Sequence, residues 1–238
     1  YDIAVIDLIG DRIGPTLLLT LTGAVLALII GTLLGVFTAL RSGSKLETFI
    51  SFITYTLYSM PAFWLGIMLI LLFALKLGLL PTSGMIDVRS AYTGIAYYLD
   101  ILRHMLLPTM TLVLIQIPIY YRISQASVLQ VLNEDFIVTF RAVGMDEKKI
   151  FRKYALKNAI LPVITVFGIS LAYLVAGSAL IEIVFSWPGM GRLMLEAIMR
   201  RDYPLLMGIY FILSLSVAVM MILTDVVYAY IDPRIRYQ

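Results

Sequence analysis

Residues 13–40 read IGPTLLLTLTGAVLALIIGTLLGVFTAL, a stretch of 28 residues that contains no Asp, Glu, Lys or Arg. About 20 apolar residues in an α-helix are enough to cross the ~30 Å hydrocarbon core of a bilayer. The stretch is too long for a β-strand, and it lacks the alternating pattern of a transmembrane barrel. Because a helix satisfies its own backbone hydrogen bonds in lipid, we predict a transmembrane helix here.

Four further stretches of the same kind follow along the chain. The five uncharged stretches cover residues 13–40, 48–75, 104–121, 158–181 and 203–224. The composition agrees, since 61% of the 238 residues are hydrophobic and 14% are charged, whereas soluble domains are ~45–50% apolar and ~25% charged. We predict an all-α integral membrane protein, with one transmembrane domain over residues 1–238 and five transmembrane helices. The composition disfavours an ordinary soluble enzyme, a nucleic-acid binder and a disordered chain.

The distribution of charge predicts the orientation of these helices. The connections on one side carry eleven Lys and Arg residues and those on the other side carry seven. Since cytoplasmic loops are enriched in Lys and Arg, we expect the C-terminus and the 122–157 loop to face the cytoplasm. On the outer side, residues 77–100 form a turn-rich surface segment, and residues 186–202 form a short amphipathic helix with Trp187 at headgroup depth.

The sequence lacks the common motifs of covalent chemistry. It contains no GxxxxGK[ST] phosphate loop, no HExxH zinc motif, no GxSxG nucleophile motif and no cysteine. The single histidine, His104, has no second His or Cys with which to share a metal ion, so an interfacial or helix-end role is favoured. We therefore expect a non-catalytic chain with no bound cofactor and no metal site.

The most informative part of the cytoplasmic loop is residues 133–162, NEDFIVTFRAVGMDEKKIFRKYALKNAILP. A first helix through Phe136 and Phe140 is predicted to end at Gly144, since glycine readily adopts the left-handed conformation of a helix C-terminal cap. Asp146 and Glu147 suit the electropositive start of a second helix, and basic residues occupy its later turns. The apolar side of this second helix must lie on lipid, on the helix bundle or on another protein.

This segment resembles the EAA loop of bacterial ATP-binding cassette (ABC) importer permeases. The chain is similar to the first permease subunit of the dipeptide/oligopeptide/nickel family from about residue 12 to residue 237. The matching blocks read SMPAFWLG (59–66), LPTSG (80–84), RAVG (141–144), ALKNAILP (155–162), VFSWPGMG (184–191) and RDYP (201–204). Two features depart from the superfamily pattern: Lys157 replaces a proline, and Val138, Thr139 and Phe140 stand in place of E-A-A. Family members carry one more N-terminal helix, so six spans are expected in the full subunit.

The resemblance implies a type I ABC importer permease fold with a cytoplasmic coupling helix, in a bacterial or archaeal inner membrane. The implied partners are a second homologous permease, two ATPase subunits that bind ATP and Mg, an extracytoplasmic solute-binding protein and membrane lipid, but no nucleic acid. The implied function is a pathway for short peptides or a related solute such as nickel, driven by ATP hydrolysis in the partner subunits. The predicted ATPase-docking residues are Gly144, Asp146, Glu147, Lys148, Phe151, Arg152 and Tyr154.

Other residues are predicted for the pathway and for the outer surface, each with a structural alternative. The candidate pathway residues, which helix kinks or packing would also explain, are Tyr58, Pro61, Trp64, Gln116, Pro118 and Tyr173. The candidate contacts of the binding protein, which an interfacial anchor would also explain, are Trp187, Pro188, Gly189, Met190, Gly191 and Arg192. Glu182 and Asp225 are placed at opposite membrane surfaces, where a charge can reach water, so structural pairing is favoured over proton coupling. Two other functions stay open: a stand-alone secondary transporter or channel, and a membrane scaffold that recruits a soluble enzyme.

Overall fold

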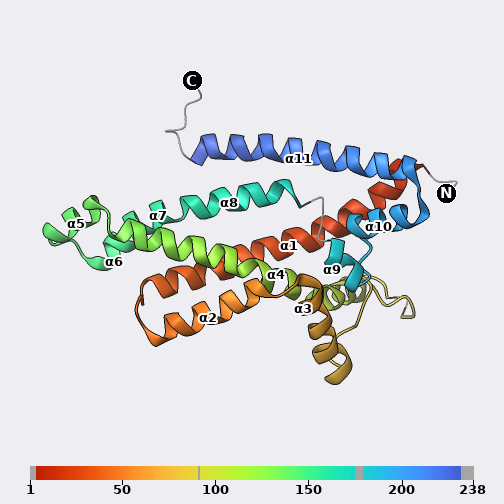
Figure 1. Cartoon of the computed structure of the whole chain (residues 1–238), viewed down its shortest axis with the longest axis horizontal. Coiled ribbons are helices and arrows are strands. Elements are labelled where there is room, and N and C mark those ends of the chain that lie inside the picture. Colours follow the sequence, from red (N-terminus) through yellow and green to blue (C-terminus); the bar gives the residue numbers. More distant parts are fainter. Residues whose placement is uncertain (1–3, 91, 175–178, 232–238) are drawn as a thin grey trace. The chain divides into compact units, whose positions relative to one another are not determined.

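A computed structural model describes residues 4–90, 92–174 and 179–231, and every regular element within these ranges is helical (Figure 1). Two of the segments, η1 and η2, are π-helical. The elements are α1 (Val5–Ala39), α2 (Lys45–Ser59), α3 (Ala62–Leu69), η1 (Ile70–Lys76), α4 (Ile95–Leu132), α5 (Asp135–Ala142), α6 (Glu147–Lys149), η2 (Ile150–Ala155), α7 (Leu156–Ala159), α8 (Leu161–Ala172), α9 (Ala179–Val184), α10 (Met190–Arg200) and α11 (Tyr203–Ile231).

The described helices confirm the predicted class of protein. Four segments are long and apolar enough to cross a membrane, and a fifth is added if α2 and the α3–η1 segment form one broken span. The four are Val5–Ala39, Ile95–Leu132, Glu147–Leu171 and Tyr203–Thr224. The helices extend beyond the predicted spans because a helix does not end where the first charged residue appears. Arg103 and Arg122, for example, bounded the predicted span at 104–121, yet both lie within α4.

The second predicted span, residues 48–75, is not one continuous helix. α2 ends at Ser59, and Pro61 has an extended conformation with φ −62° and ψ 134° before α3 begins at Ala62. Proline lacks a backbone N–H and disfavours helical geometry in the residue before it, so the helix breaks at this point. Pro118 has no such effect, because α4 is helical throughout Ile95–Leu132.

The predicted fourth span, residues 158–181, is described in part. α8 ends at Ala172, and residues 175–178 lie outside the described residues. Residues 232–238, at the C-terminal end of the sequence, also lie outside them. The side chain of Asp225 is also outside the described set. The helical segment preceding α8 begins at Glu147, well before the predicted start at residue 158, so the loop over residues 133–162 and this span form a nearly continuous series of helical turns.

The chain divides into two compact units, which are described separately. Unit 1 comprises Tyr1–Ala24, Met60–Val113 and Ile169–Gln238, and unit 2 comprises Val25–Ser59 and Leu114–Gly168. In unit 1, the start of α1 packs against α10 and α11 through a core that includes Ile9, Leu193 and Leu205.

In unit 2, α1 and α4 pack with their backbones in close approach. A Cβ atom on Gly31 would lie 2.8 Å from the Ile117 carbonyl oxygen, and one on Gly35 would lie 2.5 Å from the Tyr121 carbonyl oxygen. Small residues four apart on a helix allow this approach inside membranes, where tight packing drives helix association. Gly31 and Gly35 therefore bring α1 against the part of α4 that leads into the loop before α5.

Candidate functional site

The turn between α5 and α6 in unit 2 has the geometry that the sequence predicts. Gly144 has φ +78°, its N–H donates to the Arg141 carbonyl (3.0 Å), and the Met145 N–H donates to the Phe140 carbonyl (3.0 Å). These two hydrogen bonds form a Schellman cap, in which a left-handed residue ends the helix and satisfies its last carbonyls. The predicted end of the first loop helix at Gly144 is confirmed.

The second loop helix also begins where the sequence predicts. Asp146 is its N-cap residue, and the Asp146 carboxylate accepts a hydrogen bond from the Lys149 N–H at 3.1 Å. The helical turns of α6, η2 and α7 then follow without a gap from Glu147 to Ala159. A carboxylate at this position satisfies a free N–H group and interacts favourably with the helix dipole.

The apolar side of this loop is packed within unit 2. Ile137, Ile150 and Ala155 are fully buried, and Phe151 packs against them. The Tyr154 ring lies 4.5 Å from the Phe140 ring, measured between centroids. The two aromatic residues predicted to be anchors for a partner, Phe151 and Tyr154, are therefore half-buried and support the loop itself.

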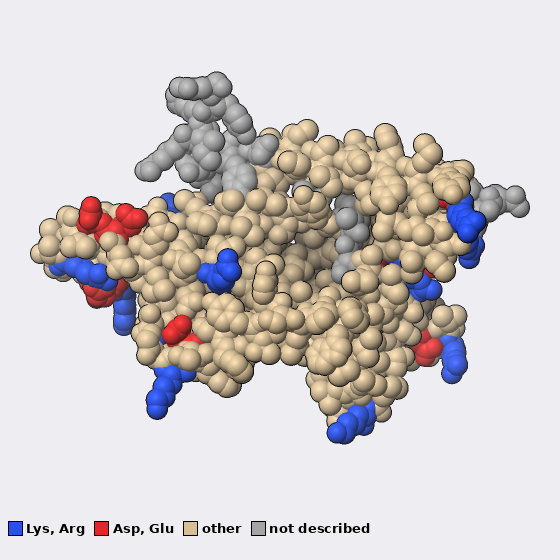
Figure 2. Space-filling view, viewed as in Figure 1, with Lys and Arg blue, Asp and Glu red and all other residues tan. Residues whose placement is uncertain are grey.

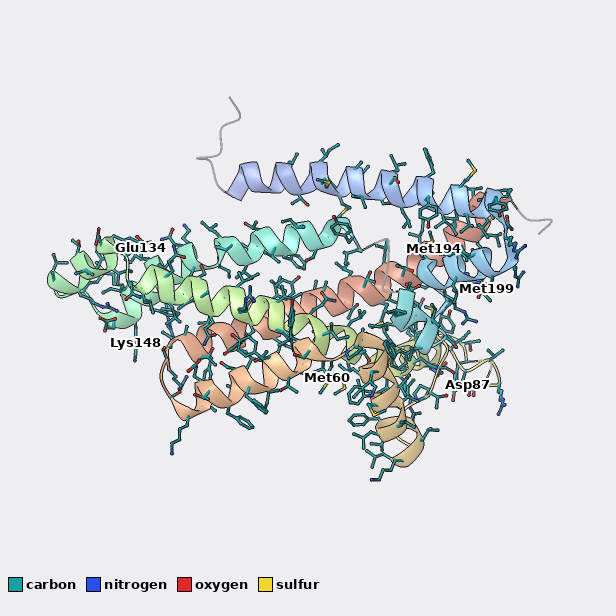
Figure 3. The ribbon with its side chains drawn as sticks, in the orientation of Figure 1. Met60, Asp87, Glu134, Lys148, Met194 and Met199 are labelled. Atoms are coloured by element: carbon teal, nitrogen blue, oxygen red, sulfur yellow. The ribbon has the colours of Figure 1, made fainter. Side chains whose placement is uncertain are left out.

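Two valines that the sequence analysis did not single out as docking residues form the apolar part of the exposed loop surface. Val143 is 71% exposed and Val138 is 55% exposed. Charged residues surround them, and Figure 2 shows acidic and basic side chains gathered over the α5–α6 segment beside a largely uncharged surface. Glu134 and Lys148 mark the same segment in Figure 3. An exposed valine beside a helix-ending glycine gives no periodic signal in the sequence, which is why it was missed.

Glu147, one of the predicted docking residues, forms an ion pair on this surface. The Arg141 guanidinium contacts the Glu147 carboxylate through Nε to Oε1 (2.8 Å) and Nη2 to Oε2 (3.4 Å). The two side chains are 43% and 66% exposed, and such pairs contribute ~0–1 kcal/mol. The pair joins the end of α5 to the start of α6 across Gly144. The predicted docking residues Asp146, Lys148 and Arg152 are all exposed on this surface.

The six candidate pathway residues are divided between the two units. Tyr58 and Pro118 line one pocket of about 130 Å³ in unit 2, together with Tyr55, Ile119, Arg122 and Ile123. Gln116 is half-buried on α4 and does not line this pocket. Pro61, Trp64 and Tyr173 belong to unit 1 and are exposed there.

The candidate contacts of the binding protein are mostly buried in unit 1. Trp187 is 0% exposed, and its indole Nε1 donates to the Pro15 carbonyl oxygen at 2.9 Å. The Trp187 ring therefore packs inside unit 1, and its position at headgroup depth stays a prediction. Gly189, Met190 and Gly191 are also buried, and Pro188 is half-buried. The exposed residues of α10 lie further along the helix and include Leu195, Ile198 and Met199.

Close packing accounts for the glycines of this block. A Cβ on Gly189 would lie 2.4 Å from the Glu182 carboxylate carbon, and one on Gly191 would lie 2.5 Å from the Ala179 Cα. Arg192 is held at the start of α10 by two contacts, from Nε to Glu196 Oε1 (3.0 Å) and from Nη1 to the Ser186 carbonyl (2.8 Å). The block therefore fixes the position of α10 against α9.

Glu182 lies at the centre of a buried polar network. Its side chain is inside unit 1 with 0% exposure, so the predicted access of its charge to water is wrong. Its carboxylate accepts from the Thr16 hydroxyl at 2.9 Å and from the Arg192 N–H at 3.1 Å. The same Thr16 hydroxyl accepts from the Met190 N–H at 2.7 Å. A carboxylate with such partners at a helix start has a structural role, and the network ties α1, α9 and α10 together.

Two acidic residues within residues 77–100, Asp87 and Asp100, also have polar partners. Ser90 Oγ and the Arg89 N–H donate to the Asp87 carboxylate at 2.6 Å and 2.9 Å, and these hydrogen bonds lower its pKa. His104 Nδ1 lies 3.2 Å from Asp100 Oδ1, and because both residues lie inside α4, His104 does not stand at a helix end. No group of three or more His, Cys, Asp or Glu residues suited to a metal ion occurs among the residues that were described.

Comparison with known proteins gives a consistent result. Residues 31–237 match the family model described as "Binding-protein-dependent transport system inner membrane component". The chain is 36% identical to the oligopeptide transport system permease protein AppB of Bacillus subtilis, over 97% of this chain and 72% of AppB. It is 35% identical to the dipeptide transport system permease protein DppB of Escherichia coli K12, over 95% of this chain and 72% of DppB.

Solved structures share the fold at lower sequence identity. An inward-facing structure of the MetNI methionine ABC transporter matches with a TM-score of 0.72 and 19% identity, over 94% of this chain and 96% of that one. A crystal structure of an amino acid ABC transporter matches with a TM-score of 0.63 and 19% identity, over 96% of this chain and 94% of that one. These matches confirm the type I importer permease fold predicted from the sequence. The chain belongs to the family of binding-protein-dependent transport system inner membrane components.

Proposed function

We propose that this chain is the pathway-forming permease subunit of an ABC importer that takes up short peptides. The observation that carries the proposal is the match to peptide permeases at 35–36% identity over at least 95% of the chain. The family match from residue 31 to residue 237 supports a non-catalytic role, in which ATP and Mg bind to partner ATPase subunits. Nickel or another small solute is the second candidate substrate class.

The proposed assembly contains a second homologous permease, two ATPase subunits and an extracytoplasmic binding protein. In this assembly the α5–α7 segment faces the cytoplasm and docks on one ATPase. Three features of the segment support this: the rigid Gly144 turn, the exposed Val138 and Val143, and the charged rim around them. The predicted aromatic residues hold the segment in shape, so movement of the ATPase would be transmitted to α4 and α8 as a unit.

Reconstitution of the complete transporter tests this function. Proteoliposomes containing both permeases and the ATPases, with binding protein outside and ATP inside, should accumulate radiolabelled dipeptide. Replacing ATP by a non-hydrolysable analogue should abolish the uptake, whereas a protonophore should leave it unchanged. Uptake that continues without hydrolysis and stops with the protonophore would contradict the proposal and favour a secondary transporter.

A further inference from the structure

A pocket of about 130 Å³ opens between α2 and α4 in unit 2. Tyr55 and Tyr58 line it from α2, and Pro118, Ile119, Arg122 and Ile123 line it from α4. Its volume is well below the ~300–1,000 Å³ of a typical small-molecule site. The pocket therefore has room for one end of a peptide rather than for a whole peptide.

Arg122 is the charged residue of this pocket, and its charge is not neutralised by a neighbour. Among the described residues, no ion pair or side-chain hydrogen bond involves the Arg122 guanidinium. Two other arginines form ion pairs: Arg141 with Glu147, and Arg192 with Glu196. A guanidinium group in a pocket with two phenol rings is suited to an anionic oxygen ligand. Its N–H donors lie in one plane and can bind both oxygens of a carboxylate.

The nearest polar network makes the pocket rigid without using Arg122. The Tyr121 hydroxyl lies 2.7 Å from Ser51 Oγ, and Gln125 Nε2 donates to Glu47 Oε1 at 3.1 Å. Both contacts join α2 to α4, and the Tyr121 side chain is fully buried. The Glu47 carboxylate is held by Gln125 and Ser51, so the acidic residue on this part of α2 is already engaged.

We propose that this pocket is a subsite for the terminal carboxylate of a peptide in transit, with Arg122 as the binding residue and the Tyr55 and Tyr58 rings as its walls. The proposal rests on the proposed function, which supplies a substrate class with a free carboxylate. The pocket unites two residues that the sequence analysis assigned to the pathway, Tyr58 and Pro118, with a cation that it assigned to the positive inner loop. One exposed arginine gives weak binding, which a passing substrate requires because it must also leave.

Cysteine labelling of the pocket tests the subsite directly. The natural sequence has no cysteine, so Ile119→Cys places one thiol of this subunit at the pocket, where Ile119 is 39% exposed. The complete nucleotide-free transporter, without binding protein, is treated with a maleimide, and the mass of this subunit reports the labelling rate. Millimolar dialanine should slow labelling at least about threefold, as expected at a concentration of about twice the Kd. Dialanine amide, which lacks the carboxylate charge, should not.

Three further variants make the result specific to Arg122. In the Arg122→Gln background, protection by dialanine should fall to the level of the amide, and Arg122→Lys should restore part of it. Arg141→Gln, a matched change at an exposed arginine outside the pocket, should leave protection intact. Equal protection by acid and amide, protection that survives Arg122→Gln, or labelling that no peptide affects would each overturn the subsite.

The same preparation separates this proposal from the two nearest alternatives. If anionic lipid in nanodiscs slows labelling while dialanine does not, Arg122 binds lipid phosphate and the peptide subsite is refuted. If the Ile119→Cys transporter accumulates dipeptide with ATP but shows no protection, the subsite fails while the proposed function stands. If wild-type transporter shows no ATP-driven uptake, the proposed function itself fails.

Discussion

Glu182 in unit 1 and Glu147 in unit 2 are both acidic residues near the start of a helix, yet their surroundings are opposite. Glu182 is 0% exposed, and its carboxylate accepts from Thr16 and from the Arg192 N–H. The Glu147 side chain is 66% exposed and contacts Arg141 in water. A buried carboxylate with fixed partners holds parts of one chain together, whereas an exposed charged surface is free to meet another chain.

The comparison extends from these two residues to their neighbourhoods. Around Glu182, the close contacts at Gly189 and Gly191 leave no room for side chains. Around Glu147, Gly144 has open space within 4 Å of its Cβ position. We infer that substitutions in the first region will act through stability, and that substitutions in the second will act through partner binding and transport.

The largest expected effect is on the stability of unit 1. Replacing Glu182 by Leu leaves the Thr16 hydroxyl and the Arg192 N–H without their acceptor, and each lost buried hydrogen bond costs ~1–3 kcal/mol. We expect destabilisation by about 3 kcal/mol, measured by thermal unfolding of the detergent-solubilised protein. Glu196→Leu is the matched control, because the Glu196 side chain is 30% exposed and forms a partly exposed ion pair with Arg192. Equal unfolding midpoints for the two variants would show that the buried network is not structural.

The next largest expected effect is a loss of transport, without an additional loss of stability, when Gly144 is replaced. Gly144 and Gly43 have φ +78° and +80°, and neither has a neighbouring atom within 4 Å of its Cβ position. A side chain in this conformation costs ~1–2 kcal/mol, so Gly144→Val and Gly43→Val should lose similar stability. We expect only Gly144→Val to reduce dipeptide uptake and ATPase stimulation, by about tenfold or more, which corresponds to ~1.4 kcal/mol of coupling. Similar uptake by both variants would contradict a coupling role for this turn.

The smallest expected effect concerns the exposed ion pair. Arg141→Ala removes a contact worth ~0–1 kcal/mol, so uptake and the unfolding midpoint should change little. Glu147→Gln should give a similarly small change, because it removes the negative charge of the same pair and leaves an oxygen that can accept from Arg141. A large loss of uptake in Arg141→Ala alone would show that Arg141 contacts a partner in addition to Glu147.

The parts of this structure that could be predicted from sequence depend on local patterns. Uncharged stretches predict the membrane class, and glycine followed by acidic and then basic residues predicts the two helices of the loop. Pro61 has an extended conformation and interrupts a predicted span, whereas Pro118 lies within a continuous helix, so a proline in an apolar stretch does not by itself predict a break.

The parts that could not be predicted depend on contacts between distant residues. Glu182 is 166 residues from its partner Thr16, and Trp187 is 172 residues from its partner Pro15. The sequence around Glu182 and Trp187 is typical of a membrane surface. Only the packing of α1 against α9 and α10 buries the two side chains. Phe151 and Tyr154 were assigned to a partner for a similar reason, since an apolar helix side does not reveal whether its own chain covers it.

The most direct test of a docking surface at the α5–α7 segment is the recovery of ATPase subunits with the tagged permease. Val143→Asp places a charge on the most exposed apolar residue of the loop, and Val88→Asp makes the same change at a valine that is 87% exposed in unit 1. After solubilisation in mild detergent, the account predicts that the Val143→Asp complex loses most of its ATPase while the Val88→Asp complex retains it. Equal ATPase recovery with both variants would contradict the assignment of this loop as the docking surface.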